Sequence, residues 1–363
     1  MKILVLEPYF GGSHGLFLQG LQQHLPYNFD LLTLPARKWK WRLRLAGPYF
    51  AEQLNKQDPG KQYDRILCSS FVDVAAFRSL VNRQFQQIPL YTYFHENQFA
   101  YPVQKEDERD FHFGLTNLTT ALASDRIGFN TQYNLQTFLA GVKKILKICP
   151  DMKLAGAIDR IKERTTIVHP GIDFSGFPEP DTCTSDSGSP PVIVWNHRWE
   201  HDKNPEYFFE TFFKLDKQNV DFRLIIVGQS FQRKPAIFDE ARKKLAHKIL
   251  HFGYVESREE YIKLLCKADI VVSTARHEFY GISVIEAVRA GCYQLLPARL
   301  SYPELFPAEY LYGDGELFSR LKSLLGYPDR LDRCRTKPLT ESFSWPVLKK
   351  KYLEWFEGYS RTV

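Results

Sequence analysis

The sequence has no long apolar run. None of its segments approaches the roughly 20 apolar residues that a membrane-spanning helix requires. The first ten residues, MKILVLEPYF, also lack the basic start and the small-residue cleavage site of a signal peptide. With a mean hydropathy of -0.34, the protein is expected to be cytoplasmic and to have no membrane partner.

Closely spaced cysteines are missing as well. The six cysteines never come closer to one another than 26 residues, which excludes CxxC redox motifs and the usual zinc motifs. Because nothing indicates secretion, reduced thiols are expected rather than disulfides. The cysteines are Cys68, Cys149, Cys183, Cys266, Cys292 and Cys334.

Three common nucleotide-binding motifs are absent. The chain has no GxGxxG fingerprint and no GxxxxGKS/T loop, which argues against dinucleotide-binding and P-loop enzymes. It also has no DxD, the carboxylate pair that often holds a nucleotide-bound divalent metal. We therefore expect a site that works without a metal and without a cofactor.

The sequence does contain enough apolar material for two domains. The chain has 363 residues, of which 44% are hydrophobic and 25% charged, a balance typical of globular rather than disordered or fibrous proteins. Apolar segments alternate with helical segments on both sides of a proline- and serine-rich stretch, FPEPDTCTSDSGSPP. This alternation predicts α/β domains, each with a doubly wound parallel sheet covered on both faces.

The predicted domain boundaries follow from the same alternation. An N-terminal domain is predicted for residues 1–173, a linker for 174–191 and a C-terminal domain for 192–340. The aromatic, amphipathic tail 341–363 is predicted to form a helix that packs back across the domains. Open parallel sheets bind ligands beyond the carboxyl ends of their strands, so two such domains are expected to face each other across one deep cleft.

The positive charge is unevenly distributed along the chain. The net charge is +6, and residues 1–170 hold 21 lysines and arginines against 15 acidic residues. Residues 171–363 hold 27 basic and 27 acidic residues, so the whole excess belongs to the N-terminal half. This excess indicates either an acidic partner for that half or ordinary surface charge.

Two glutamates lie eight residues apart at a predicted strand-loop-helix junction. Glu278 and Gly281 lie in a loop after the apolar segment ADIVVST, and Glu286 lies in the first turns of the following helix. This arrangement can bring both carboxylates to the ligand-binding edge, beside helix N–H groups that suit an anion. The alternative is a loop acid with a solvated acid on a helix face.

Two cations follow another apolar segment, PVIVWN. Arg198 and Lys203 lie between this predicted strand and a helix that begins near Pro205. At the carboxyl end of a strand they suit a diphosphate whose negative charge grows as it leaves. A surface ion-pair loop with Glu200 and Asp202 is the alternative.

The N-terminal half has candidate residues in two turns. Gly12 and His14 belong to the turn after the first strand, where glycine either lets the backbone approach a ligand or permits a tight turn. His95 and Asn97 end the strand PLYTYF, and a histidine there, beside Glu96, suits hydroxyl binding or proton transfer. A structural histidine bonded to the backbone is the alternative.

A basic and aromatic segment, RKWKWRLR, spans residues 37–44 and contains no acid. Cations interleaved with aromatic rings can neutralise phosphates and stack on unpaired bases. The segment is expected to be a loop with this role, or else a surface turn whose tryptophans pack on the domain. Its candidate contacts are Arg37, Lys38, Trp39, Lys40, Trp41, Arg42 and Arg44.

Together these motifs resemble the retaining glycosyltransferases of family 4, which have the GT-B architecture of two Rossmann-like domains. The resemblance spans the whole chain and includes the Arg-x4-Lys spacing at Arg198 and the Glu-x7-Glu spacing at Glu278. Four segments, EPYFGGSH, FHENQFAYP, HRWEHDKNP and HEFYGISVIEA, are similar to one branch, the tRNA-queuosine α-mannosyltransferases. That branch moves mannose from GDP-mannose to queuosine at the wobble position of aspartate tRNA.

The resemblance implies a nucleotide sugar and tRNA as partners, and a role for each matching residue. The implied catalytic residues are His95 beside the transferred sugar, Arg198 and Lys203 at the donor diphosphate, and Glu278 at the sugar hydroxyls. Further implied donor contacts are Gly12 at the phosphates, Gly253 and Tyr254 near the base, Gly281 beside Glu278, and Glu286 at the ribose. The implied acceptor contacts are His14, Asn97 and residues 37–44. The chain departs from the common pattern at His197 and Asn204, where glycines are usual.

Two other functions fit part of the same residues. Another family 4 transferase, acting on a lipid, a polysaccharide or a small molecule, would share the donor residues but would not need segment 37–44. A non-catalytic tRNA-binding protein on a transferase scaffold would need that segment but not the intact Arg198, Lys203, Glu278 and Glu286.

Overall fold

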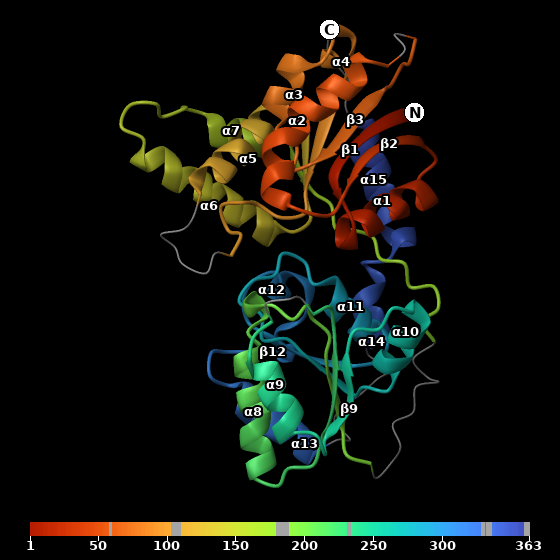
Figure 1. Cartoon of the computed structure of the whole chain (residues 1–363), viewed down its shortest axis with the longest axis vertical. Helices are drawn as coiled ribbons and strands as arrows, with labels where there is room; N and C mark the ends of the chain where they lie inside the picture. Colours follow the sequence, from red (N-terminus) through yellow and green to blue (C-terminus); the bar gives the residue numbers. More distant parts are fainter. Residues whose placement is uncertain are drawn as a thin grey trace. The chain divides into compact units, whose positions relative to one another are not determined.

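The chain forms two compact units (Figure 1). The computed structural model describes residues 1–57, 60–102, 110–178, 189–230, 234–327, 331 and 336–358. One unit consists of Met1–Ile172 with Trp345–Val363, and the other of Asp173–Ser344. The range expected for the linker, 174–191, thus falls within the second unit, and its residues 179–188 lie outside the described residues.

The first unit contains a six-stranded parallel sheet in the order β2-β1-β3-β4-β5-β6. Its strands are β1 (Lys2–Phe10), β2 (Asn28–Pro35), β3 (Arg65–Ser69), β4 (Leu90–Phe94), β5 (Arg126–Phe129) and β6 (Thr165–Ile167). Its helices are α1 (Gly12–His24), α2 (Trp39–Asn55), α3 (Val74–Leu80), α4 (Arg83–Gln86), α5 (Phe111–Ala123), α6 (Gln132–Ile148), α7 (Ala157–Glu163) and α15 (Trp345–Glu357). The strand order reverses between β1 and β3, and ligands of open α/β sheets bind at the carboxyl ends of such a pair. We call this pair the switch point of the sheet.

Apolar side chains cover both faces of this sheet. Successive residues of β1 point to opposite faces, so that Ile3 and Val5 pack with α1 and α15 while Leu4 and Leu6 pack with α2 and α3. A further cluster joins β4 and β5 to α5, α6 and α7. Because both faces are covered, the central strands are continuous apolar runs, as the sequence predicts.

The C-terminal helix α15 packs on the first unit and begins at Trp345. Trp345 lies against two glycines, since a Cβ atom at Gly20 or Gly171 would lie 2.2 or 2.3 Å from its ring. On the same helix, Tyr352 donates a hydrogen bond to the carbonyl oxygen of His169 (2.8 Å). The helix α15 therefore belongs to the same hydrophobic core as the N-terminal strand β1.

The second unit also contains a six-stranded parallel sheet, in the order β12-β11-β10-β7-β8-β9. Its strands are β7 (Val192–Trp195), β8 (Arg223–Val227), β9 (Ile249–Gly253), β10 (Ile270–Val272), β11 (Tyr293–Pro297) and β12 (Leu311–Tyr312). Its helices are η3 (His201–Lys203), α8 (Pro205–Lys217), α9 (Ile237–Lys244), α10 (Arg258–Cys266), α11 (Ile282–Arg289), α12 (Tyr302–Leu305), η4 (Ala308–Tyr310), α13 (Leu317–Gly326) and α14 (Thr336–Glu341). The switch point of this sheet lies between β7 and β10.

Aromatic side chains fill one side of the second sheet. Phe208 and Phe212 of α8 and Phe238 of α9 pack around Trp195 of β7, together with apolar residues of α13. On α11, residues 284–288 are buried, and this helix packs against β10, β11 and α14. Packed helices thus flank β7 and β10.

Segment 37–44 differs from the loop expected from the sequence. Lys38 has a left-handed φ of 54°, and α2 begins at Trp39. Leu43, Ala46 and Phe50 recur at three- and four-residue intervals and are all buried. A helix is favoured because it places these apolar side chains on one face, whereas the density of basic residues suggested a solvated loop.

Four of the six cysteines lie in the described part of the chain, and all four are free thiols. Cys68 and Cys292 are buried, whereas Cys149 and Cys266 are partly buried. Cys183 and Cys334 lie outside the described residues. Among the described helices, none is both long and apolar enough to span a membrane.

Candidate active site

In the second unit, the loops that follow β7 and β10 are bonded to each other. The Thr274 hydroxyl donates hydrogen bonds to the carbonyl oxygens of Lys203 (2.9 Å) and Asn204 (3.1 Å). Asn204, with a left-handed φ of 52°, is the residue before α8. Arg198, Lys203 and Glu278 therefore lie in two loops that meet at the predicted ligand-binding edge.

Lys203 is buried between two carboxylates. Its Nζ lies 3.1 Å from Asp202 Oδ2 and 3.3 Å from Glu278 Oε2, and it donates to the carbonyl oxygen of His277 at 2.8 Å. These three acceptors use all three donors of an ammonium group. Burial opposes the charge, but Glu278 and Asp202 outweigh it and raise the pKa of Lys203. An anionic ligand must therefore replace one of its present partners.

Glu278 is ionised and held at both oxygens. Its Oε2 pairs with Lys203, and its Oε1 accepts from the backbone N–H groups of Phe279 (3.2 Å) and Tyr280 (3.4 Å). Burial alone would raise the pKa of Glu278, but the charge of Lys203 prevails and lowers it to about 2. The side chain is still 18% exposed, so it can accept a hydrogen bond from a ligand hydroxyl.

Gly281 explains why the loop after β10 ends where it does. Its φ of 95° lies in the region that strains any side chain, and a Cβ atom there would lie 3.3 Å from the Tyr302 ring. The same Cβ atom would lie 3.6 Å from Glu278 Cγ. Gly281 therefore lets the chain turn into α11 directly behind the Glu278 carboxylate.

Arg198 is the accessible cation of this site. Its side chain is 51% exposed, and Nη2 lies 3.1 Å from Glu200 Oε2, which matches the surface ion pair of the alternative interpretation. The neighbouring His197 is buried, and Nε2 has no hydrogen-bond partner among the described residues. Burial, and then the charge of Lys203, lower the pKa of His197 to about 4, so this imidazole is neutral. The two predicted diphosphate cations thus differ, one exposed and one enclosed.

Glu286 lies deeper than the sequence suggested. On α11 it is buried, with Arg258 Nη1 2.9 Å from its Oε1 and the Tyr261 hydroxyl donating to its Oε2 at 3.2 Å. Burial raises the pKa of Glu286, against the opposing effects of Arg258 and Tyr261. Asn196, in the loop after β7, donates to the Tyr261 hydroxyl at 3.1 Å. A ribose hydroxyl would have to share this carboxylate with both partners.

Gly253 and Tyr254 lie at the carboxyl end of β9, on the same edge of the sheet. Gly253 has a φ of 143°, and its carbonyl oxygen accepts from the N–H of Gly228 at 3.2 Å. The Tyr254 side chain is exposed. An exposed ring at a strand end can stack on a base, and the base contact of these two residues stays a prediction.

At the switch point of the first unit, a buried histidine lies between two carboxylates. His14 Nδ1 is 3.1 Å from Glu7 Oε2, and His14 Nε2 is 3.5 Å from Glu96 Oε2. Glu7 lies within β1 and also accepts from the Ser69 hydroxyl at 3.2 Å. Burial would lower the pKa of His14, but the two carboxylates prevail and raise it to about 10. His14 is therefore an imidazolium whose two N–H groups face carboxylates.

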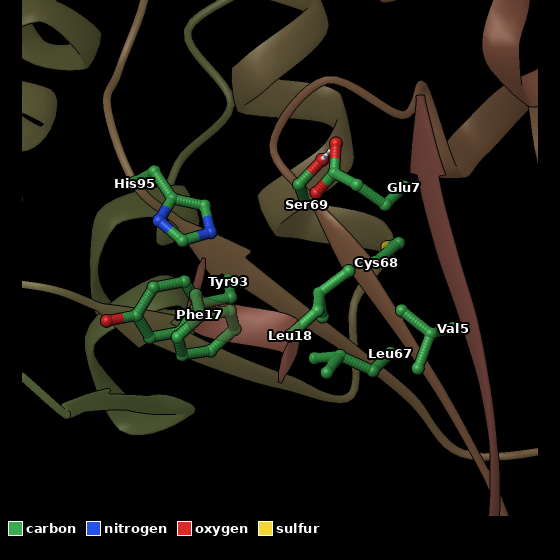
Figure 2. Close-up of a pocket in the computed structure, with 9 residues that line it drawn as sticks. All are labelled: Val5, Glu7, Phe17, Leu18, Leu67, Cys68, Ser69, Tyr93 and His95. Atoms are coloured by element: carbon green, nitrogen blue, oxygen red, sulfur yellow. Dashed lines mark hydrogen bonds between the residues drawn. The ribbon is translucent and has the colours of Figure 1, made fainter. Parts of the chain in front are cut away.

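His95 stacks against His14, with ring centroids 4.0 Å apart and planes inclined by 31°. The Phe17 and Tyr93 rings lie edge-on to it at 4.9 and 4.7 Å. Burial, and then the charge of His14, hold the pKa of His95 well below its ordinary value. His95 and Glu7 both line a small cavity (Figure 2), whose volume is about 10 Å³. The cavity has room for about one water molecule.

Glu7, His14 and His95 have potential metal-ligating atoms within 4.8 Å of one another. A metal binds an imidazole in the plane of the ring, along the lone pair of a nitrogen. Both nitrogens of His14 already face carboxylates, and an imidazolium has no lone pair to offer a metal. The cluster fits a charge-paired histidine better than a metal centre.

The other two candidates of the first unit have different surroundings. Gly12 begins α1 with a φ of 52°, and a Cβ atom there would meet nothing within 4 Å, so there is space beside it. Asn97 is buried, and its amide nitrogen donates to Asn134 Oδ1 (2.9 Å) and Thr137 Oγ1 (3.0 Å). Its amide oxygen accepts from two backbone N–H groups of the following residues. Asn97 therefore shapes the loop after β4 and has no group left for the predicted acceptor contact.

The two tryptophans of segment 37–44 behave differently. Trp39 is half-buried, and its ring centroid lies 5.3 Å from that of Phe113. Trp41 is 68% exposed, and Leu45 and Tyr49, at 53% and 42%, follow it at four-residue intervals on α2. Residues four apart lie on the same helix face. Trp39 therefore packs on the unit, as one interpretation expects, whereas the base contact of the exposed Trp41 stays a prediction.

The five basic side chains of the segment differ in exposure. Four of them, Arg37, Lys38, Lys40 and Arg44, are exposed. Arg44 is partly tied, since Nη1 donates to Thr116 Oγ1 at 3.3 Å. Arg42 is half-buried, and it donates to the carbonyl oxygen of Pro35 at 3.5 Å. The segment therefore presents cations and an aromatic ring together at the start of α2.

Four residues of these clusters have no functional role predicted from the sequence: Glu7, Asp202, Arg258 and Tyr261. For Glu7 a signal exists, because a single acid inside the apolar strand KILVLE is costly to bury unless it has a charged partner. For Asp202 the sequence suggests only a surface ion pair with Arg198 or Lys203. Arg258 and Tyr261 lie on an ordinary amphipathic helix, and nothing in their spacing points to Glu286.

Comparison with known proteins identifies the relatives of the chain. A family model described as tRNA-queuosine alpha-mannosyltransferase N-terminal matches residues 2–172, and one described as Glycosyl transferases group 1 matches residues 185–318. A tRNA-queuosine alpha-mannosyltransferase of Drosophila melanogaster is 34% identical over 381 residues, which cover 98% of this chain and 97% of that protein. A GDP-mannose-dependent alpha-(1-6)-phosphatidylinositol dimannoside mannosyltransferase of Mycobacterium tuberculosis is 23% identical over 197 residues, 52% of this chain and 51% of that protein.

Solved structures agree on the fold. Sucrose-phosphate synthase of Thermosynechococcus elongatus superposes with a TM-score of 0.71 at 14% identity, covering 99% of this chain and 100% of that one. Anabaena HepE in complex with UDP and glucose gives 0.68 at 13% identity, with the same coverage. With its two doubly wound parallel sheets, the chain has the GT-B fold. Since the Drosophila relative aligns with nearly its whole length, the chain belongs to the tRNA-queuosine alpha-mannosyltransferase family.

Proposed function

We propose that the protein transfers mannose from GDP-mannose to queuosine at the wobble position of aspartate tRNA, with retention of configuration. The observation that carries the proposal is the similarity of the whole chain to a tRNA-queuosine alpha-mannosyltransferase. The GDP-mannose dependence named for the mycobacterial relative supports the choice of donor. A cytoplasmic location is part of the proposal, and free thiols at the described cysteines support it.

In this proposal the second unit binds the donor. As the bond between the anomeric carbon and the diphosphate oxygen breaks, negative charge grows on the diphosphate. The exposed Arg198 guanidinium turns from Glu200 to this charge, and Lys203 exchanges a carboxylate for a phosphate oxygen. Glu278, ionised because of Lys203, accepts hydrogen bonds from the sugar hydroxyls. Glu286, Gly253 and Tyr254 are proposed to contact the nucleoside, and Gly12 the phosphates.

The transfer step needs no protein nucleophile. A queuosine hydroxyl attacks the anomeric carbon on the face from which the diphosphate leaves, so that a new C–O bond forms while the old one breaks. A phosphate oxygen of the donor takes the hydroxyl proton, and configuration is retained. The transition state carries positive charge on the sugar ring, as in other glycosyl chemistry. His95 is proposed to lie beside this ring as a neutral imidazole.

The start of α2 is proposed to contact the tRNA. The exposed Trp41 can stack on an unpaired base, while the cations around it neutralise neighbouring phosphates. Trp39 is excluded from this role because its ring packs inside the unit. The positive excess of residues 1–170 supports an acidic partner for the same unit.

Labelled nucleotide sugars and bulk tRNA test the proposal directly. Purified protein is incubated with GDP-mannose, and in parallel with UDP-glucose, using tRNA from cells that contain queuosine and from cells that lack it. Label is expected only from GDP-mannose and only in queuosine-containing tRNA, and nucleoside digestion should recover mannosyl-queuosine. Label in a lipid or polysaccharide instead, or in tRNA without queuosine, would refute the proposed acceptor.

A further inference from the structure

Two buried histidines of the first unit stack on each other but have opposite surroundings. His14 has a carboxylate at each ring nitrogen, from Glu7 at 3.1 Å and from Glu96 at 3.5 Å. Among the described residues, no hydrogen bond reaches a ring nitrogen of His95. The carbonyl oxygen of His95 accepts one from the Asn130 amide group. Both ring nitrogens of His14 therefore have partners inside the protein. A neutral His95 ring keeps one N–H donor and one nitrogen acceptor for a ligand.

Only one of the two stacked histidines can be protonated without strong electrostatic repulsion. Two imidazolium rings with centroids 4.0 Å apart would repel each other strongly in a buried environment. The carboxylates assign the charge to His14, and the aromatic neighbours of His95, Phe17 and Tyr93, offer it no counter-charge. Phe71 covers the His14 ring in a parallel stack at 5.4 Å and 8°.

We propose that His14 is a positioning residue, an imidazolium fixed between Glu7 and Glu96 that keeps the stacked His95 uncharged and correctly oriented. This differs from the acceptor contact that the sequence predicts for His14, because neither of its N–H groups is free for a ligand. It rests on the proposed function in one respect, namely that His95 lies beside the transferred sugar.

A neutral His95 matters because of the charge of the reaction. The sugar ring becomes positive in the transition state, so an imidazolium beside it would raise the barrier, whereas a neutral imidazole can accept from a sugar hydroxyl. His14 therefore allows transfer to continue at slightly acidic pH, at which an ordinary histidine with a pKa near 6.5 would gain a proton.

The remaining ionisable groups around His95 do not change this conclusion. They are Glu7 and His14 across the cavity and the stack, Glu96 next in the chain, Tyr93 at the ring edge and Cys68 in the cavity wall. Burial raises the pKa of the Cys68 thiol to about 12, so Cys68 is neutral. The two carboxylates are already paired with His14.

The substitution His14→Gln keeps a hydrogen-bonding side chain but removes the charge. In this variant the pKa of His95 should rise, because burial alone still opposes its charge. Below the new pKa, kcat should fall about tenfold for each pH unit, with little change in the KM for the donor. The wild-type rate should change less than about twofold between about pH 8 and about pH 5.5. His24→Gln is the matched control, since His24 lies on the same helix and also stacks on an aromatic ring, that of Trp345 at 5.2 Å.

Nitrogen NMR of ¹⁵N-histidine in the full chain gives a readout that does not depend on activity. His14 should be doubly protonated and His95 neutral across this pH range, and Glu96→Gln should lower the pKa of His14 without unfolding the chain. A neutral His14, a wild-type His95 that titrates near its ordinary value, or identical pH profiles for His14→Gln and His24→Gln would overturn the proposal. If the wild-type protein transfers no mannose, the proposed function fails, and the NMR titration still decides the charge of each histidine.

Discussion

The two units use the same device, a buried cation between two carboxylates, at the switch points of their sheets. The clusters are Asp202, Lys203 and Glu278 in the second unit and Glu7, His14 and Glu96 in the first. The cations differ, because the pKa of Lys203 is raised above its ordinary value of 10.5, whereas the pKa of His14 is raised to about 10. As the pH rises, the cluster of the first unit is therefore expected to lose its positive charge before that of the second unit.

The surfaces of the units differ as well. Residues 1–170 carry the whole positive excess, and residues 171–363 have equal numbers of basic and acidic residues. In the second unit Arg198 and Lys203 are both paired with carboxylates. In the first unit, segment 37–44 has four exposed cations and the exposed Trp41. A polyanion is thus expected to prefer the first unit, and a small nucleotide sugar does not depend on that surface.

The largest effect is expected from the donor cations. Arg198→Ala and Lys203→Ala should each lower kcat on the order of 10²-fold or more, because each removes charge from the departing diphosphate. The free energy of unfolding should distinguish the two variants. Lys203→Ala removes a buried cation from between the half-buried Asp202 and Glu278, at a cost of up to about 3–5 kcal/mol. The exposed Arg198 pair contributes only about 0–1 kcal/mol. Kinetics with GDP-mannose and urea unfolding measure both quantities.

Lys214, an exposed lysine of α8, provides the matched control for these variants. Lys214→Ala should leave kcat and stability unchanged. Near-wild-type kcat in both Arg198→Ala and Lys203→Ala would show that the diphosphate binds elsewhere, and the difference between the two units would lose its functional meaning.

The second effect concerns the basic surface of the first unit. Replacing Arg37, Lys38, Lys40, Arg42 and Arg44 with neutral residues should raise the KM for tRNA and flatten its salt dependence, since fewer counterions are released on binding. Slow hydrolysis of GDP-mannose should persist, because these residues lie outside the donor unit. An unchanged salt slope would mean that tRNA binds at another surface.

The two tryptophans sharpen this test. Trp41→Ala should weaken tRNA binding by about 1–3 kcal/mol, the contribution of one stacked base, with no loss of stability. Trp39→Ala should instead destabilise the first unit, by up to about 3 kcal/mol for a half-buried indole, with a smaller direct effect on binding. Filter binding and urea unfolding distinguish them, and equal effects of both variants on affinity would contradict stacking by Trp41.

A smaller effect is expected in the pH dependence of stability. The folded-state pKa of His14, about 10, exceeds its ordinary value of 6.5, so its stabilisation is complete below pH 6.5 and is lost as the pH rises through 10. The pKa of Glu278 is lowered from 4.5 to about 2, so its effect on stability depends on pH in the opposite direction. This stabilisation is present above pH 4.5 and is lost as the pH falls through 2.

Urea unfolding as a function of pH measures both contributions in one series. His14→Gln should remove part of the alkaline loss of stability only, and Glu278→Gln part of the acid loss only. If either variant changed the free energy of unfolding equally at acid and at alkaline pH, the two clusters would not be independent.

The smallest effect is expected from metal removal, because the proposed donor site works without a metal. Lys203 lies between the two nearby acids, Asp202 and Glu278, and Arg198 and Lys203 already supply cations for the diphosphate. Transfer should therefore survive EDTA at an undiminished rate. Complete loss of activity in EDTA, restored by magnesium or manganese, would overturn this prediction.

Much of the fold could be predicted because the spacing of apolar residues along a strand or helix reports which of its faces is buried. The apolar runs around β1, β3, β4, β7, β8 and β10 are buried on both faces, and those of β1, β4, β7 and β10 are followed by residues of the candidate sites. The strand β2 and the helix α2 were not predicted. In α2 the basic residues obscured the apolar spacing, which becomes clear only when Leu43 and Phe50 are seen buried in the unit.

The sequence by itself determined two α/β domains, the positions of Arg198, Lys203, Glu278 and His95 at strand ends, and the basic character of the first half. Only the tertiary structure decided which groups meet: Glu7 with His14, Arg258 with Glu286, and Trp39 with Phe113, while Trp41 stays exposed. The physical reason is that periodicity reports how one element is buried. The charge on a side chain, and its freedom to bind a ligand, depend on partners from other elements, and these are brought near by strand order and helix packing.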